Sequence, residues 1–97
     1  MTKEKVRQVL KIYRRKLASL GVAKADYPHG KLLNINQNYQ QRGLWHCHAM
    51  LDKIEGFIKE DRMDKVFRWL GFVQGCLWMQ RIYTLEDLTN HNRKDSK

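Results

Sequence analysis

Apolar residues recur every three or four positions in several long stretches of the chain, which predicts an all-α protein. The most apolar stretch runs from Met63 to Ile82, about five or six helical turns. A helix that is apolar on every side has to be buried on every side. A chain of 97 residues has little protein of its own with which to cover such a helix. Its central stripe consists of Val66, Leu70, Val73 and Leu77, and it is flanked by Phe67, Trp69, Phe72, Cys76, Trp78 and Met79.

A second copy of the chain would supply the missing cover, so we expect a homodimer paired through this helix. Gly71 and Gly75 lie one turn apart within it. Because each glycine weakens a helix by about 0.5–1 kcal/mol relative to alanine, the pair indicates close packing against another helix. The alternative is a local weakening that accommodates a bulky neighbour such as Trp45 or Trp69. The expected oligomer interface consists of Trp69, Gly71, Phe72, Gly75, Trp78 and Met79.

Three further helices are predicted around the apolar one. The first should cover residues 2–20, with Thr2 as N-cap and Gly21 in the left-handed conformation after its end. The second should cover residues 38–60, where Asn38 and Gln41 have the spacing of a capping box. Because only residues 61–62 separate it from the apolar helix, the two should form an antiparallel helix hairpin.

The last predicted helix is short and covers about residues 85–90. Thr84 is its expected N-cap, with Asp87 three residues on, and Tyr83 and Leu88 are placed for a hydrophobic staple. Asp61 and Asp64 are expected to cap the apolar helix.

The length predicts one small helical bundle with three main helices and a short fourth. Leu32, Leu33 and Ile35 should anchor the long connection onto the helices. The expected organisation is a single domain over 1–97: a basic amphipathic helix at 1–20, a packed connector at 21–37, a helical core at 38–91 and a frayed tail at 92–97.

Positive charge is concentrated in the first helix. The formal net charge is +9, and residues 1–20 contribute two thirds of it, since seven bases there face only one acid, Glu4. Such localised basicity attracts nucleic acid, nucleotides or an acidic protein surface, whereas a solvated face usually mixes both signs. The candidate anion- or partner-binding residues are Lys3, Arg7, Lys11, Arg14 and Arg15, which form a stripe opposite the core stripe of that helix.

The run HCHAMLD at residues 46–52 contains the most suggestive metal ligands, yet a helix argues against a metal site. Successive helical residues point about 100° apart, so His46 and His48 diverge and neither points at Cys47. His48 and Asp52, four apart, are expected to hydrogen-bond. The chain also has no glycine-rich phosphate loop and no paired-carboxylate arrangement. We therefore expect no metal, no cofactor and no enzymatic activity.

The second half of the chain resembles small proteins encoded by tailed phages and prophages. The resemblance covers about residues 44–93 and rests on HCHAMLD at 46–52, WLGFVQGCLW at 69–78, IYTLEDL at 82–88 and NHNR at 90–93. It carries no functional residues with it. It implies the cytoplasm of a bacterial host during infection, where small phage proteins often bind and inhibit a host factor, including CRISPR and other defence systems.

The expected function is therefore binding. The leading hypothesis is a phage-type accessory protein that blocks a host or defence component, in the manner of an anti-CRISPR protein. One alternative is a nucleic-acid-binding protein that uses the basic first helix, and another is a sponge for a nucleotide signal. No apolar run reaches the length of a membrane span, and both cysteines, Cys47 and Cys76, have apolar neighbours, which is typical of reduced thiols in a cytoplasmic protein.

Overall fold

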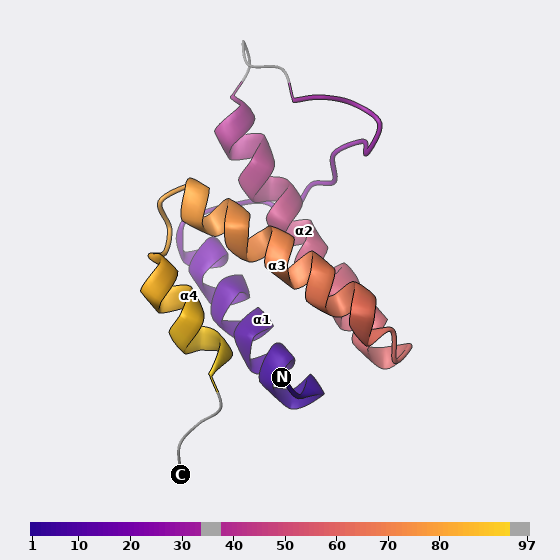
Figure 1. Ribbon diagram of the computed structural model, residues 1–97. Coiled ribbons are helices and arrows are strands. Elements are labelled where there is room, and N and C mark those ends of the chain that lie inside the picture. Colours follow the sequence, from indigo (N-terminus) through magenta and orange to yellow (C-terminus); the bar gives the residue numbers. More distant parts are fainter. Residues whose placement is uncertain (34–37, 94–97) are drawn as a thin grey trace.

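Four helices make up the part of the chain that the computed structural model describes, residues 1–33 and 38–93, and no strand occurs within it (Figure 1). They are α1 (Lys3–Ser19), α2 (Tyr39–Lys59), α3 (Met63–Met79) and α4 (Leu85–Asn92). The all-α prediction is confirmed, although α3 ends three residues earlier and α4 two residues later than expected.

One hydrophobic core joins the four helices. α2 packs against α3 along the apolar stripes of both, α1 packs against α2, and α4 lies beside α1 (Figure 1). The stripe predicted for the apolar helix is the buried face of α3, and the buried residues of α1 and α2 recur at the same helical spacing. Each fully buried large side chain stabilises this packing by about 1.5–3 kcal/mol. The core contains Val6, Val9, Leu10, Tyr13, Leu17, Cys47, Met50, Leu51, Ile54, Ile58, Val66, Leu70, Val73, Leu77 and Leu88.

The connection between α1 and α2 is held differently from the prediction. Leu32 is 94% exposed and Leu33 is 39% exposed, so neither serves as the expected anchor, and Ile35 lies outside the described residues. Val22 packs against the core instead, and the backbone amide of Ala25 donates to the carbonyl of Trp45. This backbone hydrogen bond attaches the connector to α2. Backbone amides and carbonyls that are shielded from water need such partners.

The helix starts divide into capped and uncapped ones. The side chains of Thr2 and Thr84 accept from backbone amides as predicted, and Thr84 forms a complete capping box with Asp87. Asn38 makes no such bond, because its side-chain amide donates to the side chain of Gln41. Arg62 precedes α3 without a side-chain cap, so the predicted capping role of Asp61 is wrong.

Asp61 instead closes the preceding helix in a left-handed conformation. Gly21, Asp61 and Arg81 have φ angles of 72°, 59° and 62°. Each follows a helix end where two backbone amides return to carbonyls of the last turn, as Ile82 does to Leu77. These are Schellman motifs, and only the first has the glycine that this conformation favours.

Replacing Arg81 with glycine should therefore raise the free energy of unfolding by about 0.5–1 kcal/mol. The left-handed conformation costs an ordinary residue roughly 1–2 kcal/mol, and glycine avoids this cost. Part of the gain is lost because glycine has more backbone freedom in the unfolded chain. Gly21→Ala is the matched control, and urea unfolding should show it destabilised. A lower midpoint for Arg81→Gly would contradict the assignment.

A buried polar network ties α1, α3 and α4 together. The Gln74 side-chain amide donates to the Tyr13 hydroxyl at 3.0 Å and to Asn92 at 2.7 Å. The Tyr13 hydroxyl also lies 3.1 Å from Nδ1 of His91. Burial, opposed by the bond from Gln74, raises the pKa of Tyr13 to about 12. Asn92, predicted to belong to a frayed tail, is thus fixed as the last residue of α4, and residues 94–97 of that tail lie outside the described residues.

Candidate functional site

Three of the five bases of the α1 stripe form ion pairs with acids of α2 and of the turn that follows it. Lys3 pairs with Asp61 at 2.7 Å, and Arg7 pairs with Glu55 at 3.2 Å. Arg14 pairs with Asp52 at 3.2 Å and also donates to the carbonyl of Leu51. These three bases therefore lie along the side of α1 next to α2, and for them the predicted position opposite the core stripe is wrong.

Asp52 is the centre of this ionic contact. It accepts from Lys24 of the connector at 2.9 Å as well as from Arg14. The hydrogen bond from Lys24, aided by Arg14, holds the pKa of the Asp52 carboxyl below its usual value. His48, expected to bond with Asp52, is buried and its Nδ1 lies 2.9 Å from the carbonyl of Val22 instead.

Lys11 and Arg15, the other two candidates of the stripe, have no acidic partner in the described ranges 1–33 and 38–93. They line a shallow groove of about 460 Å³ together with Lys16, Ile12 and Tyr83. The Lys16 ammonium lies 6.0 Å from the centre of the Tyr83 ring. The five residues predicted to act together are thus split, with three engaged in ion pairs and two open to an anion.

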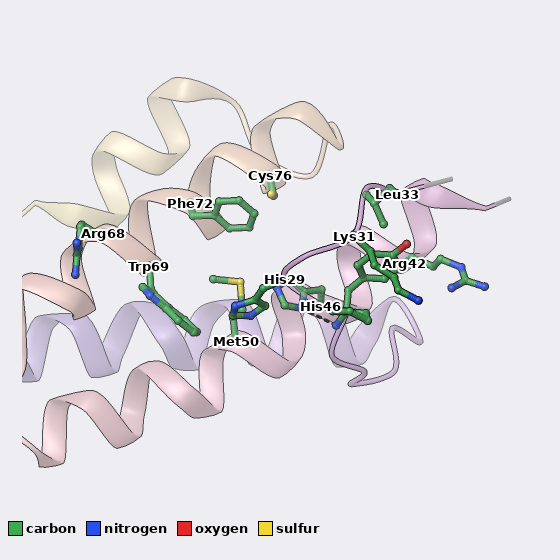
Figure 2. Close-up of a pocket in the computed structure, with 13 residues that line it drawn as sticks. His29, Lys31, Leu33, Arg42, His46, Met50, Arg68, Trp69, Phe72 and Cys76 are labelled. Atoms are coloured by element: carbon green, nitrogen blue, oxygen red, sulfur yellow. Dashed lines mark hydrogen bonds between the residues drawn. The ribbon is translucent and has the colours of Figure 1, made fainter. Parts of the chain in front are cut away.

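A larger cleft opens between the connector, the first half of α2 and the outer side of α3 (Figure 2). Its volume is about 640 Å³, within the size range of small-molecule sites. Figure 2 shows Arg68 and Trp69 at one end and Lys31, Leu33 and Arg42 at the other, with His29, His46 and Met50 between them. The remaining lining residues are Tyr27, Pro28, Gly43, Phe72 and Cys76.

Hydrogen bonds and ring contacts hold the walls of the cleft. The amide of Tyr27 donates to Nδ1 of His46 at 3.1 Å, which fastens the connector over α2. The His29 ring contacts the rings of both His46 and Trp69 edge to face. The Trp69 ring also packs edge to face on Phe57, with ring centres 4.9 Å apart. Aromatic rings from three segments therefore meet in one wall.

The charged residues that line the cleft have one sign. Lys31, Arg42 and Arg68 line it, and no carboxylate occurs among its lining residues in the described part of the chain. Burial lowers the pKa of His46, with Asp26 opposing and His29 and Lys53 adding to the effect. An apolar cavity with three cations and a neutral histidine is suited to an anion that also has a flat apolar part.

Cys76 lines the cleft and Cys47 lies behind it in the core. The two free thiols are hydrogen-bonded to each other. This hydrogen bond, aided by burial, raises the pKa of Cys47, and it lowers the pKa of Cys76 against the opposing effect of burial. His46 and His48 bond to different residues of the connector, Tyr27 and Val22. In the described residues no group of three His, Cys, Asp or Glu side chains could hold a metal ion.

α3 presents a second surface beside the cleft. Phe67, Phe72, Trp78 and Met79 remain 41%, 54%, 45% and 72% exposed. A Cβ added at Gly71 or Gly75 would meet no atom within 4 Å, so the glycines do not accommodate a bulky neighbour of the same chain. Of the residues predicted for an oligomer interface, Trp69 alone turns away, since its ring packs into the cleft wall.

Sequence reasoning missed the cleft because a loop makes one of its walls. The sequence shows turn residues at 26–30, but it does not show which helices the turn packs against. The signal that could have been weighed is Lys31 and Arg42, two bases close in sequence to aromatic residues and without a nearby acid.

Comparison with known proteins identifies no relative of this chain. No protein-family model, curated protein or solved structure matches this chain. Across residues 1–33 and 38–93, every helix is too short or too polar to cross a bilayer.

Proposed function

We propose that this protein is a non-enzymatic binding protein whose cleft takes a planar anion of the nucleotide class. The observation that carries the proposal is the coincidence of aromatic walls with three cations and no described carboxylate in one cavity. A base is flat and apolar on its faces, and phosphate is an anion that arginine can bind through two hydrogen bonds at once. Both halves of such a ligand find a matching part of the cleft.

The arrangement in the cleft favours a particular orientation. The ring of Trp69, with His29 against it, offers a stacking surface for a base, and stacking of this kind contributes about 1–3 kcal/mol. Arg68 stands beside Trp69, and Lys31 and Arg42 stand at the far end (Figure 2). A ligand with phosphate at both ends of an apolar body, such as a dinucleotide, would meet cations at each end.

This proposal favours the nucleotide sponge among the functions expected from the sequence. We propose in addition that it acts in a bacterial host cytoplasm as a phage-type accessory protein, and that it inhibits a defence component by removing its nucleotide signal. The resemblance of residues 44–93 to phage proteins supports that context. We propose that the working form of the protein is a homodimer in which α2 and α3 of each copy form an antiparallel hairpin.

A second candidate function rests on the α1 groove. Lys11, Arg15 and Lys16 line it without a described acid, which suits the phosphate backbone of nucleic acid. Its weakness is that Lys3, Arg7 and Arg14 already bind acids of the same chain. A protein that tracks a backbone needs several open cations, so the groove supports at most a short contact.

Replacing Arg42 with alanine should weaken nucleotide binding about 10–100-fold. The loss of one charge-assisted hydrogen bond to phosphate accounts for roughly 1.5–3 kcal/mol. Titration calorimetry with mononucleotides, cyclic dinucleotides, nucleosides and inorganic phosphate measures it, and the nucleosides and phosphate should bind much less tightly than the intact nucleotides.

Arg15→Ala is the matched control, because it removes an arginine from the α1 groove instead of the cleft. It should leave nucleotide affinity unchanged. If no nucleotide binds the wild type, or if Arg15→Ala weakens binding and Arg42→Ala does not, the cleft proposal fails. Binding of single-stranded nucleic acid that Arg15→Ala reduces would support the second candidate instead.

A further inference from the structure

The exposed face of α3 is apolar over nearly its whole length. Between residues 67 and 79, Arg68 is the only charged residue. Helical periodicity places Gly71 and Gly75 along the middle of this face with the exposed Arg68 beside Gly75 in projection along the helix axis, Phe67 and Trp78 along one edge, and Phe72 and Met79 along the other. Because neither glycine has an atom within 4 Å of its Cβ position, the face is a shallow trough between two ridges of large side chains.

The area of the face fits a modest interface. The four large side chains keep 41–72% of their surface, which amounts to roughly 400 Å² if each bare side chain presents about 150–250 Å². A monomer seldom leaves more than a patch of about 300–600 Å² uncovered, and such patches are usually functional. Two such faces bury about 800 Å² of large side chains, and polar residues at the rim add to this area, which corresponds to a weak complex below the roughly 1,200 Å² of standard interfaces.

The pattern of the face is complementary to itself. If two α3 helices cross antiparallel with the two-fold axis near residue 73, Gly71 lies opposite Gly75 of the partner subunit. The same crossing brings Phe67 beside Trp78 of the partner subunit on one edge and Phe72 beside its own counterpart on the other. Each glycine trough then receives the other helix, and bulky side chains meet only bulky side chains.

Charge selects between the two possible directions. In a parallel pair, Arg68 and Asp64 would each lie opposite the same residue of the other copy, and like charges repel. In the antiparallel pair, the two Arg68 side chains lie about 15 Å apart along the helix. Asp64 then lies near the C-terminal end of α3 in the other copy, close to Arg81 of the partner subunit. The protein as a whole is strongly positive, so this nearly uncharged face is where two copies meet with the least repulsion.

We propose that a second copy of this chain docks on the exposed face of α3 in the antiparallel direction. The dimer is formed by Phe67, Gly71, Phe72, Gly75, Trp78 and Met79. Phe67 was not predicted from the sequence, and Trp69 is not part of the interface. The proposal does not rest on what the cleft binds, although Phe72 belongs both to this face and to the lining of the cleft.

Light scattering and sedimentation at micromolar protein concentrations test the dimer. Gly75→Leu should weaken self-association about tenfold or more, since the added side chain fills the trough. The same change should leave the thermal midpoint of the dilute monomer unchanged or higher, because leucine favours a helix and the position is open. Gly56→Ala in α2, at another open position, is the control and should remain dimeric.

Direction is tested by cysteine cross-linking across the interface. Phe72→Cys should form a disulfide between two copies, and Asp64→Cys should not, because the antiparallel crossing separates the two Asp64 positions. A wild type that stays monomeric, or a Gly75→Leu variant that associates as tightly as the wild type, overturns the dimer. Cross-linking through Asp64→Cys in place of Phe72→Cys overturns the antiparallel direction.

Discussion

Replacing Tyr13 with alanine should lower the free energy of unfolding by about 3–5 kcal/mol, the largest effect we expect from a single substitution. The Tyr13 ring is completely buried and packs against the rings of Tyr83 and His91, with centres 5.6 and 5.4 Å away. Its removal leaves a cavity where α1, α3 and α4 meet. It also leaves Gln74 without one of its two hydrogen-bond acceptors.

Tyr13→Phe separates the hydroxyl from the ring. It should cost about 1–3 kcal/mol, because the ring still fills the site while Gln74 and His91 lose a buried partner. Urea unfolding followed by circular dichroism measures both variants. If Tyr13→Phe proves as stable as the wild type, the hydroxyl network does not stabilise the fold, whatever the alanine variant shows.

Lowering the pH from about 7.5 to about 5.5 should weaken the hydrogen bond between the Tyr27 amide of the connector and His46 of α2. His46 accepts the amide hydrogen of Tyr27 at Nδ1, and a protonated imidazole has no acceptor there. Burial holds the pKa of His46 below its ordinary value of 6.5, so the folded state binds fewer protons than the unfolded chain. The stability that His46 contributes is therefore present above pH 6.5 and lost as the pH falls below it.

Hydrogen exchange at the Tyr27 amide is the direct measurement, and protection should fall over this range. His46→Asn is the control, because its side-chain oxygen can accept the same hydrogen bond without titrating. His91 has its pKa lowered by burial too, so global stability should fall with it, while exchange at Tyr27 reports on His46. Equal pH dependence in His46→Asn would rule out His46 as the cause.

The helices were predictable because their information is local. The apolar stripe of Val66, Leu70, Val73 and Leu77 and the capping box of Thr84 and Asp87 depend on residues a few positions apart. Likewise Gly21 marks the end of α1 by the backbone conformation that it adopts. Where one residue type has a single strong local preference, the sequence alone is sufficient.

The site was not predictable because its parts are distant in sequence. Arg7 and Glu55, or His29 and Trp69, come together only after the helices have packed. The charge of α1 was correctly located, but its acid partners on α2 are spaced along that helix without a pattern of their own. Leu32 and Leu33 show the reverse error, since an apolar residue in a loop does not have to be buried.

Phe72 belongs to two surfaces at once. It lines the cleft and it also stands on the exposed face of α3. Whatever covers that face also shifts or fixes one wall of the cavity, so occupancy of the two surfaces is thermodynamically linked. If self-association changes the affinity of the cleft for its ligand by some factor, the bound ligand must change the association constant of the dimer by the same factor. A single aromatic ring would thus make the concentration of the protein a determinant of how tightly it holds its ligand.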